Sequence, residues 1–301
     1  MKNFKIDDFI RQLKIDIPSK EKFFQLSEKT PVISELDEIH EYDSKLTSSE
    51  VEEKFADLHS INFERGMLLY GLIAKIKPKS IVEIGTAGGY STLSMAWALA
   101  DYNIDGKIYT IDPNPLGKYD EKNSIKNYWE NFAPREWTEK IEVITGYSGE
   151  VLSKKKIPLI DFGYIDGSHV YEAVKHDFFA ILKNSSVDFS ILFDDYLPNG
   201  NDGVAKVINE EIINKFEPTM IETNSKKQRM ELQSGDAVEH CMCLIDNNSL
   251  KKSLWETYSE NEIAVELEKY QALEKRIRVR KKINSKIPLL EKIKFQFWKK
   301  V

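Results

Sequence analysis

Three aspartates stand at the ends of two short apolar stretches of this sequence. Asp166 ends the stretch 159–166, and the pair Asp194-Asp195 ends the next one, which begins at residue 189. Carboxylates that converge without a counterion repel one another, whereas Mg²⁺ and Mn²⁺ prefer oxygen-rich sets of ligands. We therefore expect Asp166, Asp194 and Asp195 to hold a divalent metal ion. In the simpler alternative, Asp166 belongs to a turn with Gly167 and Asp194 caps a helix.

A histidine, His169, follows Asp166 by three residues. Its unperturbed pKa of about 6.5 suits a general base at neutral pH. A metal ion can stabilise the alkoxide of a hydroxyl substrate, so Asp166 and His169 together predict a site that activates a hydroxyl group. His169 could instead be a metal ligand or a hydrogen-bonded residue of the pocket wall.

A glycine-rich turn lies between a predicted strand, residues 80–84, and a predicted helix, residues 90–101. Glycines let the backbone approach a ligand closely, and the N–H groups that begin the helix can bind a carboxylate or phosphate. The dinucleotide fingerprint fails at Ala87, and no Gly-Lys-Ser/Thr follows. Asp112 ends the next strand, where an acid suits a ribose diol, although it could also cap the turn that follows.

The segment Glu-Ile-Gly-Thr-x-x-Gly-Tyr-Ser-Thr-Leu from Glu83, with the strand that ends at Asp112, resembles motifs I and II of class I S-adenosylmethionine-dependent methyltransferases. Over residues 60–245 the chain resembles the catechol-type and macrolide-sugar O-methyltransferases. The resemblance implies that residues 83–89 line the methionine part of the cofactor and that residues 146–148 flank its adenine. The implied cofactor-binding residues are Glu83, Gly85, Thr86, Ala87, Gly88, Gly89, Tyr90, Ser91, Asp112, Gly146, Tyr147, Ser148 and Asp166.

The resemblance extends to the acids and to an upstream helix. Metal-dependent members of the family carry an Asp at the fourth strand end and an Asp-Asn or Asp-Asp pair at the fifth, and the matching positions here are Asp166 and Asp194-Asp195. Catechol-type enzymes place a lysine base where this chain has His169, which is a departure. The segment Glu64-Arg65-Gly66 matches one that closes over the cofactor in such enzymes. The implied acceptor is a hydroxyl of a sugar, a glycan or a small natural product.

The site residues are separated by short apolar runs that alternate with helix-length segments. This alternation predicts an α/β, Rossmann-like, mostly parallel sheet of seven strands with helices on both faces, an antiparallel last hairpin and helical additions at both ends. The ends of parallel strands then meet at one edge, where ligands bind. The predicted strands are residues 80–84, 107–112, 141–145, 159–166, 189–194, 218–222 and 240–245.

Charge divides the chain unevenly. The net charge is −6, yet the last 32 residues contain eleven Lys/Arg against two Glu. The acidic remainder argues against a nucleic-acid partner. The amphipathic, basic end could lie on an anionic membrane surface, or dock on the acidic body or a partner subunit, which we favour. We expect a helical extension in 1–60, a methyltransferase domain in 61–250 and a helical basic tail in 251–301.

Composition favours a cytoplasmic protein, with peripheral contact at the inner membrane surface left open. The two cysteines, Cys241 and Cys243, are too close in a strand to bridge each other, and the acidic start does not resemble a secretion signal. A homo-oligomer is compatible with the sequence. The alternatives in function are a metal-independent methyltransferase acting on nitrogen or a phenol, a catalytically silent cofactor-binding assembly module and an iron-dependent hydroxylase-like relative.

Overall fold

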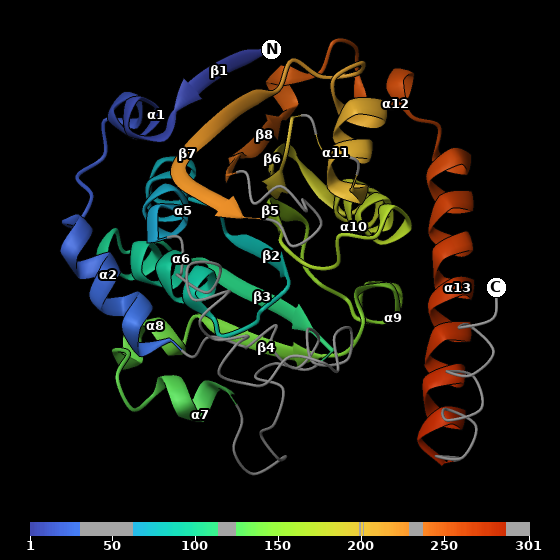
Figure 1. The fold of residues 1–301 in the computed structure, drawn as a ribbon, viewed down its shortest axis with the longest axis horizontal. Coiled ribbons are helices and arrows are strands. Elements are labelled where there is room, and N and C mark those ends of the chain that lie inside the picture. Colours follow the sequence, from blue (N-terminus) through green and yellow to red (C-terminus); the bar gives the residue numbers. More distant parts are fainter. Residues whose placement is uncertain (31–62, 114–124, 199, 201, 229–236, 287–301) are drawn as a thin grey trace.

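The computed structural model describes residues 1–30, 63–113, 125–198, 200, 202–228 and 237–286. These residues form one eight-stranded sheet with helices on both faces (Figure 1). The strands are β1 (Lys2–Lys5), β2 (Ser80–Ile84), β3 (Lys107–Asp112), β4 (Ile141–Thr145), β5 (Ile160–Ile165), β6 (Ser185–Tyr196), β7 (Thr219–Gln228) and β8 (Ala237–Asp246).

The strand order shows at which edge of the sheet a ligand is expected to bind. It runs β1-β7-β8-β6-β5-β2-β3-β4, and β8 pairs antiparallel with both β6 and β7 while the other pairs are parallel. The order therefore reverses at β2, which pairs with β3 on one side and with β5 on the other. At such a switch point the loops leave in opposite directions and open a crevice at the carboxyl ends of the strands.

The predicted parallel sheet and its last antiparallel hairpin are confirmed, but seven strands was one too few. The eighth strand, β1, lies in the segment expected to be a helical extension and pairs in parallel with β7. Its sequence, Lys-Asn-Phe-Lys, has no apolar run, so nothing local predicts it. The pairing adds backbone hydrogen bonds, beginning with Lys2 N donating to Pro218 O at 3.0 Å.

The helices follow the expected alternation. They are α1 (Ile6–Leu13), α2 (Lys20–Lys29), α5 (Phe63–Ile76), α6 (Tyr90–Asp101), α7 (Ile125–Trp129), α8 (Arg135–Thr138), α9 (Ser148–Lys154), α10 (Tyr171–Lys183), α11 (Gly203–Val207), α12 (Leu254–Thr257) and α13 (Glu260–Lys286), with a π-helix at Ile208–Ile212 and a 3-10 helix at Asn247–Ser249. The helix α11 is continued by the π-helical turn, so residues 203–212 do not form one regular α-helix.

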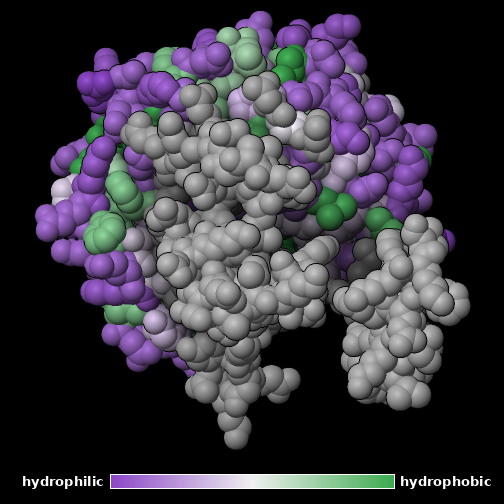
Figure 2. All heavy atoms as spheres, in the orientation of Figure 1, coloured by the Kyte–Doolittle hydropathy of each residue, from purple (hydrophilic) through white to green (hydrophobic). Residues whose placement is uncertain are grey.

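Two apolar layers sandwich the sheet. Successive strand residues alternate between them, so Ile81 packs with helices α5 and α6 while Val82 packs with α10 and α11. This alternation follows from the two-residue period of a strand. In the view of Figure 2, hydrophilic residues dominate the described surface and hydrophobic ones occur in small groups, as expected when most apolar side chains lie in the two layers.

The long helix α13 stands at the side of the domain, next to α9 and α10 (Figure 1). Ile263 and Leu267 of α13 are buried against the second layer, whereas Leu273 is exposed. This part of α13 thus packs on the body of the domain. The amphipathic segment at residues 290–301 lies outside the described residues. Within the described part of the chain, no helix is long and apolar enough to cross a membrane.

Candidate active site

The acid cluster forms where β5 and β6 end side by side. Oxygen atoms of Asp166, Asp194 and Asp195 all lie within 4.8 Å of one another, as the strand-end positions predicted. Asp195 has a positive φ of 55°, and the pairing of β6 with β8 shifts register between Phe193 and Tyr196. Such an irregularity re-aims side chains at the end of a strand. Here it turns two consecutive acids toward one site.

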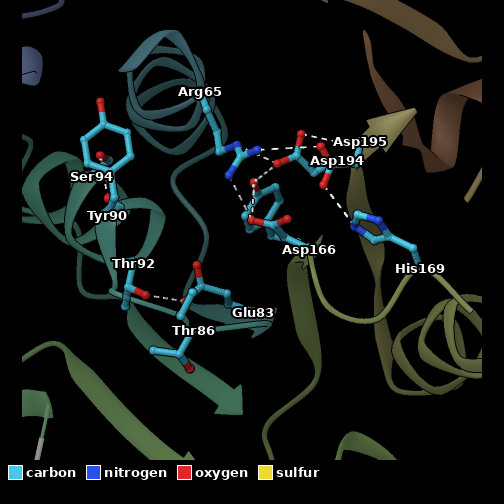
Figure 3. Close-up of polar contacts among 12 residues, drawn as sticks. Arg65, Glu83, Thr86, Tyr90, Thr92, Ser94, Asp166, His169, Asp194 and Asp195 are labelled. Atoms are coloured by element: carbon cyan, nitrogen blue, oxygen red, sulfur yellow. Dashed lines mark hydrogen bonds and ion pairs between the residues drawn. The ribbon is translucent and has the colours of Figure 1, made fainter. Parts of the chain in front are cut away.

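A counterion for these acids comes from α5. The guanidinium of Arg65 reaches between the three carboxylates (Figure 3). Its nitrogens lie 2.5 Å from Asp194 Oδ2, 3.3 Å from Asp166 Oδ2 and 3.9 Å from Asp195 Oδ1. Burial opposes the charge on Arg65, but the neighbouring acids, first Asp166 and then Asp194, raise the pKa of Arg65 well above its usual value. Arg65 is therefore the centre of an ion-pair network and compensates part of the negative charge of the three acids.

Tyr164 adds a hydrogen-bond donor to the cluster. Its hydroxyl lies 2.8 Å from Asp194 Oδ2 and 3.2 Å from Asp166 Oδ2. Burial raises the pKa of Asp166 well above its usual range, while Arg65 partly offsets this effect. A carboxyl so placed holds a proton at higher pH than an exposed aspartate does.

The glycine turn touches the acid cluster through its backbone. Gly85 has a φ of 98°, and a Cβ there would lie 2.0 Å from the carbonyl oxygen of Asp166. Asp166 N also donates to Ile84 O at 2.9 Å. The turn after β2 and the acid after β5 are thus in direct contact across the switch point, which only glycine allows at position 85.

Asp112 organises the same turn. Its Oδ2 accepts hydrogen bonds from Thr86 N at 3.0 Å and Ala87 N at 3.1 Å. The Thr86 hydroxyl bonds to that of Thr110 at 2.6 Å, and its carbonyl accepts from Gly89 N at 2.8 Å. Thr86 therefore shapes the turn with its polar groups. Asp112 lies beside the turn as predicted, with its ribose role still a prediction.

Comparison with known families identifies the domain. A family model described as a methyltransferase domain matches residues 82–196, from within β2 to the last residue of β6. The match covers the glycine turn, Asp112 and the three acids Asp166, Asp194 and Asp195, but not Arg65. Residues 82–196 are therefore similar to a methyltransferase domain. A comparison with curated proteins gave no match.

Solved O-methyltransferases have a similar fold. TomG from Streptomyces achromogenes is 18% identical, with 73% of this chain and 98% of that chain covered and a TM-score of 0.46. A putative O-methyltransferase from Klebsiella pneumoniae is also 18% identical, with 79% and 93% covered and a TM-score of 0.46. The Bacillus cereus O-methyltransferase is 20% identical, with 70% and 97% covered and a TM-score of 0.45.

His169 points at the acid cluster (Figure 3). Its Nε2 lies 2.9 Å from Asp195 Oδ2, and its side chain is 41% exposed. The other side of the ring thus remains accessible to a substrate. The contact with Asp195 fixes the orientation of the imidazole, which is compatible with each of the three roles considered for it.

Glu83 is fully buried near the end of β2. Thr92 Oγ1 donates to its Oε2 at 2.5 Å, whereas Oε1 is buried with no hydrogen-bond partner among the described residues. Burial raises the pKa of Glu83 to about 7. An acceptor without a partner beside the glycine turn is a position where a cofactor donor would fit.

The segment 146–149 after β4 lies next to Asp112. Gly146 N donates to Asp112 O at 2.9 Å, and Ser148 Oγ donates to Asp177 Oδ1 at 2.6 Å. The structure therefore brings the predicted adenine-flanking segment and the predicted ribose acid together at one edge. In the glycine turn after β2, Gly89 packs against Trp129. A Cβ on Gly89 would lie 2.1 Å from the Trp129 ring, so only glycine fits at this position.

Sequence reasoning missed two members of the acid cluster. Arg65 was assigned only to the segment that closes over the cofactor, and it is one of three charged residues of α5, with Glu64 and Lys75. Tyr164 stands two residues before Asp166, and residues two apart share one face of a strand. That spacing was the available signal for Tyr164. Arg65 carries no comparable signal, because its contacts depend on how α5 packs.

Proposed function

We propose that the protein transfers the methyl group of S-adenosylmethionine to a hydroxyl oxygen of a sugar, a glycan or a small natural product. The observation that carries the proposal is the direct contact between the glycine turn at Gly85 and the backbone of Asp166. This contact puts the family's cofactor-binding turn against a cluster of acids. Methyl transfer needs the acceptor oxygen held in line with the donor, and a polar cluster beside the turn supports that placement.

The acid cluster fits a divalent cation by its chemistry. Three carboxylates contribute oxygen atoms within 4.8 Å of one another, and oxygen-rich sets favour Mg²⁺ or Mn²⁺. Asp166, Asp194 and Asp195 would hold the ion, which when bound lowers the pKa of a hydroxyl ligand. Arg65 supplies the balancing charge in the described structure and would give up part of its contacts to an ion.

His169 is the proposed general base. Its contact with Asp195 orients the imidazole, and its 41% exposure leaves room for an acceptor hydroxyl. Because a hydroxyl is a poor nucleophile until it loses its proton, His169 would accept that proton as the oxygen attacks the methyl carbon. Asp195 would stabilise the imidazolium that forms.

A metal-independent methyltransferase is the second candidate, and Arg65 is the observation that favours it. A guanidinium already compensates part of the negative charge of the three acids, so the cluster can persist without a bound ion. In that case Arg65 and Tyr164 would bind the acceptor directly. Nitrogen or phenol acceptors then become candidates, because a phenol needs less help to ionise than an alcohol.

The deciding experiment measures S-adenosylhomocysteine formation by the purified full-length chain with a panel of sugars, glycosides, phenols and amines. The metal-assisted proposal expects turnover with a hydroxylated acceptor that stops with EDTA and returns with Mn²⁺. Asp194→Asn should abolish this turnover, whereas Asp188→Asn, on an exposed position of the same strand, should not. Turnover that survives both EDTA and Asp194→Asn would contradict it and favour the second candidate.

A further inference from the structure

The C-terminal helix α13 reaches the segment 146–149 through a buried carboxylate. Glu274 is 2% exposed, and its Oε1 accepts a hydrogen bond from Gly149 N at 3.2 Å. A Cβ on Gly149 would lie 3.0 Å from both oxygens of this carboxylate. The helix, more than 100 residues away in sequence, therefore rests directly on the segment's backbone.

A second, indirect connection joins the same two parts of the chain. The Tyr270 ring packs against the His176 ring at 4.5 Å between centroids. His176 Nδ1 lies 3.0 Å from Asp177 Oδ1, and both side chains are buried. The same oxygen accepts from Ser148 Oγ at 2.6 Å. Tyr270 thus supports Ser148 through two residues of α10.

A cavity lies on each side of these two connections between α13 and the segment 146–149. A cavity of about 480 Å³ separates α9 from α13 and is lined by side chains that include Glu150, Lys154 and Lys275. A second, of about 390 Å³, lies on the α10 side and is lined by residues that include Leu152 and Ala264. Since α13 is not packed continuously on α9, its hold on the segment 146–149 depends on few contacts.

The segment itself is part of the ligand edge. Gly146 N bonds to the carbonyl of Asp112, and the carboxylate of Asp112 bonds to the backbone of the glycine turn. A shift of residues 146–149 would therefore disturb both the site's wall and the residue beside the turn. A helix that fixes these residues changes the affinity of whatever binds there.

We propose that Glu274 and Tyr270 of α13 are positioning residues that hold the segment 146–149 for the nucleoside end of S-adenosylmethionine. The inference rests on the proposed function, because it takes the methyl donor as the ligand of this edge. Glu274 and Tyr270 do not touch the ligand in this scheme. They lower the cost of ordering the segment, so they set affinity and leave the chemistry of methyl transfer to the acid cluster.

The test measures dissociation constants for S-adenosylhomocysteine and for methylthioadenosine by calorimetry on the full-length chain. Glu274→Ala should weaken both ligands by the same factor, about tenfold for the loss of a buried hydrogen bond to a charged group. Glu274→Gln keeps an acceptor for Gly149 N and should bind within about twofold of the unaltered chain. Glu268→Ala, on an exposed position of the same helix, is the matched control and should bind normally.

Hydrogen exchange adds a direct readout, because the amides of residues 146–149 should exchange faster in Glu274→Ala. If that variant fails to fold, Tyr270→Leu, which removes the ring contact with His176, should weaken the same two ligands together. Unchanged affinity in a folded Glu274→Ala or Tyr270→Leu protein would overturn this inference but leave the proposed function standing. A lack of binding by the unaltered chain would overturn the proposed function, and the inference with it.

Discussion

Arg65 Nε lies 2.5 Å from Asp194 Oδ2, so a side chain from α5 neutralises a fully buried carboxylate at the end of β6. Two elements far apart in sequence are joined by this pair. It also means that the acids do not depend on a bound ion to remain close together. The charge balance of the cluster can therefore be tested with and without metal.

Arg65→Ala should destabilise the protein in EDTA by about 3 kcal/mol, because it leaves buried carboxylates without their counterion. Added Mn²⁺ should recover much of this loss, since the ion replaces the missing charge. Urea unfolding in EDTA and in Mn²⁺ measures both effects. Arg11→Ala removes an arginine from an exposed pair with Asp8 and should change stability little in either condition. An equal loss in both conditions for Arg65→Ala would contradict metal binding at the cluster.

Tyr164→Phe should cost about 1 to 3 kcal/mol in the free energy of unfolding, because the hydroxyl bonded to buried Asp194 is lost without a replacement. Denaturant titration provides the measurement. The matched control is Tyr102→Phe, whose hydroxyl bonds to Asp16 O at an exposed site. Similar losses in the two variants would argue against a special role for the Tyr164 hydroxyl.

Gly85→Ala should destabilise the protein by more than about 3 kcal/mol, because a positive φ and a close approach to the carbonyl of Asp166 leave no room for a Cβ. Ala87→Gly is the reverse change in the same turn. Ala87 has a φ of 42° and is exposed, so glycine should relieve strain and stabilise by up to about 1 kcal/mol. Thermal unfolding compares the two, and a tolerated Gly85→Ala would refute the contact.

Glu83→Gln should change how stability depends on pH. Burial raises the folded-state pKa of Glu83 to about 7 from its usual value of 4.5. The folded state then holds a proton that the unfolded state has released, so stability falls as pH rises between these values. The loss in this window is about 3 kcal/mol. Glu83→Gln should flatten this slope in urea titrations between pH 4.5 and 7, whereas an unchanged slope would show that Glu83 ionises normally.

The sequence predicted those features that depend on short-range pattern. Apolar runs that alternate with helices indicated the parallel sheet, and acids at the ends of two such runs were expected to meet because parallel strands share an edge. The structure has Asp166 and Asp194 there. Arg65 could not be predicted in this cluster, because its position depends on the packing of α5 over two strand ends.

The unpredicted elements arise from long-range pairing and backbone irregularity. The strand β1 has polar side chains and exists because β7 offers an unpaired edge, to which it is also tied by the ion pair of Lys5 with Glu222. The positive φ of Asp195 and the register shift of β6 depend on the pairing with β8. Neither depends on the local sequence alone, so hydrophobic periodicity gives no indication of them.

The pairing of β1 with β7 has a consequence for synthesis. Lys5 and its partner Glu222 are 217 residues apart, so β1 leaves the ribosome long before β7 is synthesised, and this edge of the sheet cannot close until then. Chains elongate at about 5 to 20 residues per second. Over that interval of many seconds the amino-terminal strand has no partner, and a nascent chain interrupted before residue 219 would lack the strand on which β1 docks.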